Sequence, residues 1–319
     1  MKRKEYIPVM EKNLQANFLC AGNRTYLIGS QNGLFPEMGW HIEGEHSGLW
    51  DHPIKLLDGF WLQIKDLESG VEEWLIRADN FIHGAFYVIH EYSLRSLQLS
   101  IVRRQFCPDE KEALVVYFDI HSLSSARRNL EVSLLVRSDL RPTWKSEEMG
   151  IIDGYDEAEF HKREGILVTK DKSNPWYLIV GSLDQPKTAK IDRNLWGPEI
   201  TRGKGISGQL TYTMTLESRA RESLKFVFAG SYNSKEEAKE TFQDVLNYDE
   251  KLYLEKGRRY LDLAKRSELD IPDEMVQETF TWIKFNYDML DRKVPGLSLI
   301  HISEPTRPLY ISYAVFCLK

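Results

Sequence analysis

The stretch LQLSIVRRQFCPDEKEALVVYFDI, residues 97–120, decides the fold class of this chain. Leu97, Leu99 and Ile101 recur at every second position, which is the spacing of a half-buried strand. The polar turn PDEK at 108–111 then precedes a second apolar run, ALVVYFDI. Two such runs joined by a short turn form an antiparallel hairpin. The stretch therefore predicts antiparallel β structure.

Similar runs lie on both sides of this hairpin. We expect strands at 130–136, 166–169 and 176–180, and an antiparallel pair formed by 210–216 and 224–229. Many short strands separated by turns, with few helical patterns, are typical of a β-sandwich. Residues 1–232 are therefore predicted to form one large antiparallel β-sandwich domain, a supersandwich.

The periodicity becomes helical after this region. Ser234 and Glu237 have the spacing of a capping box, and apolar residues then recur at helical spacing to about Lys265. Gly257 interrupts the pattern, so we expect a break or kink there. Residues 233–271 are predicted to be a helical linker.

A second helix is expected to open at Pro272. It carries an apolar stripe with steps of four, three, four and three residues: Val276, Phe280, Ile283, Tyr287 and Leu290. Such a stripe is typical of a helix packed against a partner, so residues 272–296 are predicted to start a further domain. We also expect that the helices leave apolar faces uncovered, and that a chain cut after Ser231 is more soluble.

Composition and charge exclude several classes of protein. The formal net charge of −6 argues against nucleic acid as a partner, and no apolar run approaches the roughly 18 residues of a membrane span. The N-terminus has no apolar run of a secretory signal. Cys20, Cys107 and Cys317 form no CxxC pair, so we expect no disulfide and no zinc site. We therefore expect a cytoplasmic protein without membrane contact, and no nucleotide motif indicates a cofactor.

Three blocks carry a resemblance to a known family: GLWDHPIKLLDGFW at 48–61, SDLRPTW at 138–144, and IPD at 271–273 followed by FTWIK at 280–284. The chain resembles the bacterial and archaeal glycogen-debranching (amylo-α-1,6-glucosidase-like) glycosidases. The resemblance implies a β-sandwich followed by a linker helix and an (α/α)6 barrel, of which this chain holds the first helix.

The same resemblance implies a glycoside hydrolase acting on α-glucosyl linkages of an oligo- or polysaccharide. Glycosidases of this kind use two carboxylic acids, and in this family both lie on barrel loops, beyond Gly296. No residue of this chain inherits a catalytic role, and we expect the isolated fragment, separated from its own missing barrel domain, to be inactive. The sugar, the linkage and the choice between inversion and retention stay open.

Residues 297–319, LSLIHISEPTRPLYISYAVFCLK, resemble the translation of a sequencing adapter. We therefore expect this segment to be an artefact, and His301, Glu304 and Cys317 to carry no function. The natural chain is expected to continue past Gly296 as a truncated fragment would.

Trp50, His52, Lys55 and Asp58 are the candidate substrate-binding residues. A glycine-flanked loop with these side chains could reach over the barrel mouth and contact sugar hydroxyls. The structural alternative is that Trp50 and Trp61 pack in the sandwich, while Lys55 and Asp58 form an internal salt bridge.

Two further clusters favour structural roles. His41 and His46 flank a carboxylate pair, but the pattern is not HExxH on a helix, and we expect no metal. Asp139, Arg141 and Trp144 are expected to form a structural corner, with the arginine paired to a carboxylate.

Two other classes of function remain open. A stand-alone carbohydrate-binding sandwich would end naturally near residue 232, and a scaffolding sandwich would have no sugar affinity. Titration with maltooligosaccharides separates these two classes.

Overall fold

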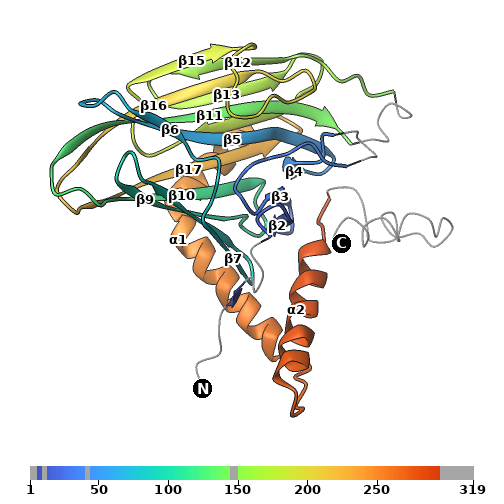
Figure 1. Ribbon diagram of the computed structural model, residues 1–319. Coiled ribbons are helices and arrows are strands. Elements are labelled where there is room, and N and C mark those ends of the chain that lie inside the picture. Colours follow the sequence, from blue (N-terminus) through green and yellow to red (C-terminus); the bar gives the residue numbers. More distant parts are fainter. Residues whose placement is uncertain (1–5, 9–12, 40–43, 144–149, 295–319) are drawn as a thin grey trace.

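The computed structural model describes residues 6–8, 13–39, 44–143 and 150–294. These residues form two antiparallel sheets that lie face to face, followed by two helices (Figure 1). The predicted fold class, a large and mainly β sandwich followed by helices, is confirmed. Whether the second helix starts a barrel, and where the domains divide, stay predictions.

The larger sheet, named sheet A here, has neighbouring strands in the following order along the described chain. They are β1 (Tyr6–Pro8), β7 (Asn80–Gly84), β8 (Val88–Leu94), β9 (Leu99–Phe106), β10 (Ala113–Ser122), β17 (Arg221–Ser231), β14 (Tyr177–Gly181), β13 (Ile166–Asp171) and β12 (Asp156–His161). The hairpin predicted from residues 97–120 is β9 and β10, which pair antiparallel.

The second sheet, sheet B, packs against the first and supplies the other half of the sandwich. Its order is β15 (Thr188–Asp192), β16 (Ser207–Leu216), β11 (Arg128–Pro142), β5 (Ile54–Asp66), β4 (Gly48–Asp51), β3 (Thr25–Ser30) and β2 (Asn17–Ala21), with β6 (Glu72–Trp74) also paired to β5.

The expected pairing of 210–216 with 224–229 is wrong. The first run is β16, which pairs with β11 and β15 in sheet B, whereas the second is β17, between β10 and β14 in sheet A. The short connection between them therefore crosses from one sheet to the other. A period of two identifies a strand, but it carries no information on which sheet the strand joins.

Sheet A is covered on both faces, which explains its long apolar runs. In β10, Leu114, Val116 and Phe118 belong to the core between the sheets. Ala113 and Val115 point the other way and pack with residues of the first helix. A strand buried on both faces has no polar alternation, as the run ALVV in β10 shows.

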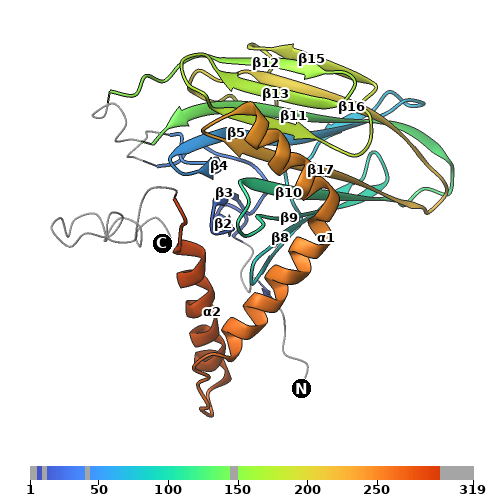
Figure 2. The same ribbon diagram turned by 180° about the vertical axis from the view of Figure 1, so that it is seen from behind.

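The helix α1 (Lys235–Lys265) covers the outer face of sheet A (Figure 2). Its Ala238, Phe242 and Val245 are buried against the sheet. The expectation that a cut after Ser231 improves solubility is therefore wrong, because removing α1 would expose the apolar outer face of sheet A. The apolar face of α1 has its partner within this chain.

The N-terminus of α1 is capped as predicted, with one difference. Ser234 accepts a hydrogen bond from the Glu237 backbone N–H at 3.2 Å. The Glu237 carboxylate accepts from Ser231 and Asn233 instead of returning a bond to the Ser234 N–H. The cap therefore also ties α1 to the end of β17.

The expected break at Gly257 is wrong. α1 runs through Gly257, which faces Phe86, and bends instead at Tyr248, whose φ of −124° and ψ of 17° are not helical. At the bend, Lys225 of β17 donates to the Leu246 carbonyl at 2.9 Å. A side chain that takes a carbonyl out of the helical ladder is a common cause of a kink.

The second helix, α2 (Glu274–Leu290), starts two residues after the expected Pro272. Asp273 is its N-cap and accepts from the N–H groups of Met275 and Val276. The two helices form a V below the sandwich in both views (Figures 1 and 2). The predicted second helix thus exists, with its start fixed by an aspartate cap.

Polar contacts hold α1 to the sandwich near the V. The buried Lys256 donates to the carbonyls of Ala21 and Cys107 at 2.7 Å each, and to Asp109 at 2.9 Å. Arg259 bridges Asp109 and Asp288 of α2. The helices and the sandwich therefore share one set of buried contacts. Among the described helices, none has the length and apolarity that crossing a membrane requires.

Candidate functional site

The four predicted binding residues lie on a hairpin, not on the expected loop. Trp50 belongs to β4, and Lys55 and Asp58 belong to β5, with His52 in the turn between them. Gly48, read as a loop signal, starts β4 with φ of +104°, and a Cβ there would collide with the Leu57 carbonyl. Glycine is needed at this position for close backbone approach within a sheet.

Trp50 and His52 form an aromatic stack with Tyr26. The Tyr26 and Trp50 rings are stacked 6.4 Å apart, and the Tyr26 hydroxyl is hydrogen-bonded to His52 Nε2 at 2.8 Å. Burial, with smaller contributions from Arg292 and His46, lowers the pKa of His52 to about 4. His52 is therefore neutral at physiological pH.

This stack contacts the helices. Trp50 and Tyr26 share an apolar cluster with Tyr260 of α1 and with Phe285 and Met289 of α2. The side chain of Trp50 is 2% exposed. Trp50 thus lies where the sandwich meets the two helices.

Lys55 lies at the centre of a buried charge cluster. Its Nζ donates to Asp58 Oδ1 at 2.6 Å and to the Glu45 carbonyl at 2.8 Å, and lies 3.3 Å from Asp139 Oδ2. Burial alone would lower the pKa of Lys55, but the carboxylates of Asp58 and Asp139 outweigh it and the pKa is raised. Burial, then the charge of Asp58, raises the pKa of Asp139 well above its ordinary value. The salt bridge named as the structural alternative is therefore present.

Asp139 is the residue of this cluster that the sequence did not connect to Lys55. It had been placed in a separate structural corner with Arg141. That corner exists: Arg141 forms an ion pair with Glu45, as expected of an arginine near a carboxylate. Because Glu45 also binds Lys55 through its carbonyl, the corner and the predicted site are one cluster. Trp144 of the same block lies outside the described residues.

A cavity of about 330 Å³ opens beside this cluster. We call it the Lys55 cavity; it is lined by Phe35, Pro36, Glu37, Gly44, Glu45, Ser47, Lys55, Asp58, Glu199, Ile200, Thr201 and Arg202. Its volume is within the range of about 300–1,000 Å³ found for small-molecule sites. Lys55 and Asp58 reach the cavity, whereas Trp50 and His52 are not among its lining residues.

Two loops form the walls of the Lys55 cavity. Arg202 holds Glu37 through two hydrogen bonds of 3.0 Å, which joins the β3–β4 connection to the β15–β16 connection. Glu199 accepts from the Phe35 N–H and from Trp61 Nε1, both at 2.8 Å. Burial raises the pKa of Glu199. No motif in the sequence indicated Glu37, Glu199 or Arg202, because they come from loops that only the fold brings together.

The cavity offers an ammonium group, a guanidinium and several carboxylates, a set suited to hydrogen-bonding a hydroxylated ligand. No group of three or more His, Cys, Asp or Glu side chains placed to hold a metal occurs among the described residues. His41 lies outside them. Cys20 and Cys107 are buried free thiols.

Comparison with protein-family models finds no match, and a search of curated proteins finds no relative. Solved structures do resemble the chain. A human-microbiome protein assigned as a kojibiose phosphorylase matches with a TM-score of 0.52 at 10% identity, over 85% of this chain and 39% of that one.

Two weaker likenesses are a bacterial glucoamylase complexed with acarbose (TM-score 0.46, 9% identity, 89% of this chain and 38% of that one) and an Escherichia coli K12 protein assigned as an aldose 1-epimerase (TM-score 0.46, 8% identity, 68% and 100%). The chain spans 39% and 38% of the lengths of the first two proteins. At 10% identity, the likeness to the first is one of fold.

Proposed function

We propose that this chain is the N-terminal part of a glycoside hydrolase of the glycogen-debranching type, acting on α-glucosyl linkages. In this proposal the sandwich and α1 support a helical catalytic domain that α2 begins. The catalytic acids lie in that domain, and the present chain supplies none.

The observation that carries the proposal is that α2 is apolar on two opposite faces. Phe285 and Met289 face the sandwich and α1 and are 8% and 3% exposed. On the other side, Ile283 and Tyr287 are 44% and 73% exposed. A helix that is apolar all round is normally buried all round. The face that the sequence predicted to need a partner is the face that the sandwich leaves open.

The outward face is a continuous stripe. Val276 and Leu290 extend it toward the two ends of the helix, at 46% and 38% exposure. All four side chains fall within one side of the helix because their steps average about 3.6 residues. We propose that the occupant of this stripe is the chain that follows Gly296 in the natural protein. The fold likeness to a protein more than twice as long supports this occupant.

The Lys55 cavity enters the proposal as a subsidiary substrate contact. Only Lys55 and Asp58, of the four residues predicted from sequence, are placed to meet a sugar there. Trp50 and His52 would act by holding the helices against the sandwich. Their assignment to substrate binding stays a prediction.

The test is an activity comparison. The natural gene, taken from independently sequenced DNA, is expected to continue for several hundred codons past Gly296. Its product should release glucose from a branched limit dextrin, and the 319-residue chain should release none. Because enzymes accelerate such reactions by about 10⁶-fold or more, the difference should be all or none.

Either of two results would contradict the proposal: a stop codon soon after Gly296 in the independent DNA, or glucose release by the 319-residue chain itself. A chain that ends near Gly296 and binds maltooligosaccharides without cleaving them would instead support the carbohydrate-binding sandwich.

A further inference from the structure

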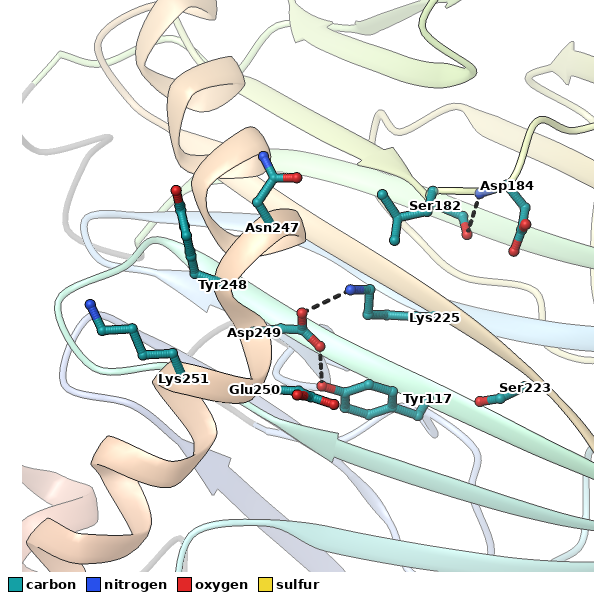
Figure 3. A pocket seen from close by; sticks show the side chains of 11 residues that line it. Tyr117, Ser182, Asp184, Ser223, Lys225, Asn247, Tyr248, Asp249, Glu250 and Lys251 are labelled. Carbon is teal, nitrogen blue, oxygen red and sulfur yellow. Dashed lines mark hydrogen bonds and ion pairs between the residues drawn. The ribbon is translucent and has the colours of Figure 1, made fainter.

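A second cavity, larger than the first, lies where α1 bends over sheet A (Figure 3). Its volume is about 590 Å³. We call it the α1 groove. Its walls carry Ser182 and Asp184 after β14, Ser223 and Lys225 on β17, and Asn247 and Glu250 on α1.

The floor of the α1 groove is fixed by a hydrogen-bonded chain. Asp249 of α1 is 2.8 Å from the Lys225 ammonium group and accepts from the Tyr117 hydroxyl. Lys225 also holds the Leu246 carbonyl at the bend. These three side chains come from α1, β17 and β10, so the floor is a rigid junction of one helix and two strands. Figure 3 shows Asp249 pointing from the helix toward both partners.

The charges of the groove argue against an ionic ligand. Lys225 and Asp249 neutralise each other across 2.8 Å, which leaves Lys251 beside Asp184 and Glu250. An anion such as phosphate would face an excess of carboxylates. A divalent cation would need more oxygen ligands, and the described residues contain no group placed to hold one.

The lining suits a neutral ligand with many hydroxyl groups. Asn247 offers both a donor and an acceptor, and the carboxylates of Asp184 and Glu250 accept from hydroxyls. The rim also carries exposed apolar surface: Tyr248 is 56% exposed and Leu183 is 63% exposed. A pyranose ring presents hydroxyl groups at its edge and an apolar face, so both kinds of surface are used.

We propose that the α1 groove is a saccharide-binding site that holds a segment of an α-glucan away from the catalytic domain. The choice of an α-glucan rests on the proposed function; the preference for a neutral polyhydroxylated ligand rests on the groove itself. Asp184 and Asn247 supply hydrogen bonds from opposite walls, and Tyr248 supplies an aromatic surface at the bend.

Calorimetric titration of maltoheptaose into the 319-residue chain tests this site. Asp184→Ala and Asn247→Ala should each weaken binding by roughly tenfold, since a hydrogen bond involving a charged or amide group contributes about 1–2 kcal/mol. Both side chains are exposed, so the variants should fold as the parent does. Asp79→Ala, which removes an exposed aspartate outside the groove, should bind like the parent.

Absence of maltoheptaose binding, or unchanged affinity in both groove variants, overturns the site. The proposed function is judged separately, by glucose release from the natural longer protein. Activity there with unchanged affinity in the groove variants would reject the site alone, whereas groove binding without any glucan hydrolysis would reject the enzyme assignment alone.

Discussion

Replacing Lys55 with methionine is expected to lower the free energy of unfolding by about 3–5 kcal/mol, the usual cost of leaving a buried charge without its partner. Lys55 is 1% exposed and lies between Asp58 and Asp139, which are 4% and 2% exposed. Methionine fills a similar volume but leaves two carboxylates facing each other in a site with little water. Urea denaturation at pH 8 measures the loss.

The deficit should depend on pH in a defined direction. The pKa of Lys55 is raised above 10.5, so its stabilising contribution is fully present below that pH and is lost only as the pH rises through the folded value. In the variant, Asp58 and Asp139 can be relieved by taking up a proton. A carboxyl with a raised folded pKa gains stability as the pH falls, so the deficit should be smaller at pH 5 than at pH 8.

Lys187→Met is the matched control, because Lys187 pairs with Glu131 at the surface, where it is about half exposed. An exposed pair contributes about 0–1 kcal/mol. Equal losses in the Lys55 and Lys187 variants, or a Lys55 deficit that does not change between pH 5 and pH 8, would show that the buried cluster does not behave as described.

The two faces of α2 should respond very differently to truncation in the 319-residue chain. Phe285→Ala removes a ring packed between Tyr260, Trp282 and the sandwich. It should cost about 3–5 kcal/mol if the helix unfolds with the core. Tyr287→Ala, two residues away on the outward face, should cost less than about 0.5 kcal/mol.

In the natural longer protein the second of these results should reverse. Tyr287→Ala combined with Ile283→Ala should then lower the thermal midpoint clearly, because both side chains would be covered by the added domain. If the pair costs nothing in the longer protein, the outward face is not an interface. If Phe285→Ala costs nothing in the short chain, α2 does not pack on the sandwich.

Much of the secondary structure could be predicted from the sequence. The hairpin at residues 97–120 and the stripe on α2 both follow from periodicity, because buried positions recur every two residues in a strand and every three or four in a helix. The pairing of β16 and β17 could not be predicted, since the same alternation fits either sheet. Only packing of the whole chain decides which neighbours a strand takes.

The candidate site was only partly predictable for a related reason. Lys55 and Asp58 lie close in the sequence, and their ion pair was foreseen as an alternative. Asp139 is distant in the sequence and reaches Lys55 because β11 pairs with β5. Glu199 and Arg202 come from a connection without any motif. The glycines at 44 and 48 were taken as signs of a loop, although Gly48 serves a close backbone approach inside sheet B.

The central claim is that the outward face of α2 is covered in the natural protein. Thiol labelling at Ile283→Cys, in a Cys317→Ser background, measures this directly, because Cys20 and Cys107 are buried and should react slowly. The introduced thiol should label rapidly in the 319-residue chain and at least tenfold more slowly in the natural longer protein, where a covered thiol reacts only after local opening. Equal labelling rates in the two proteins would contradict the claim.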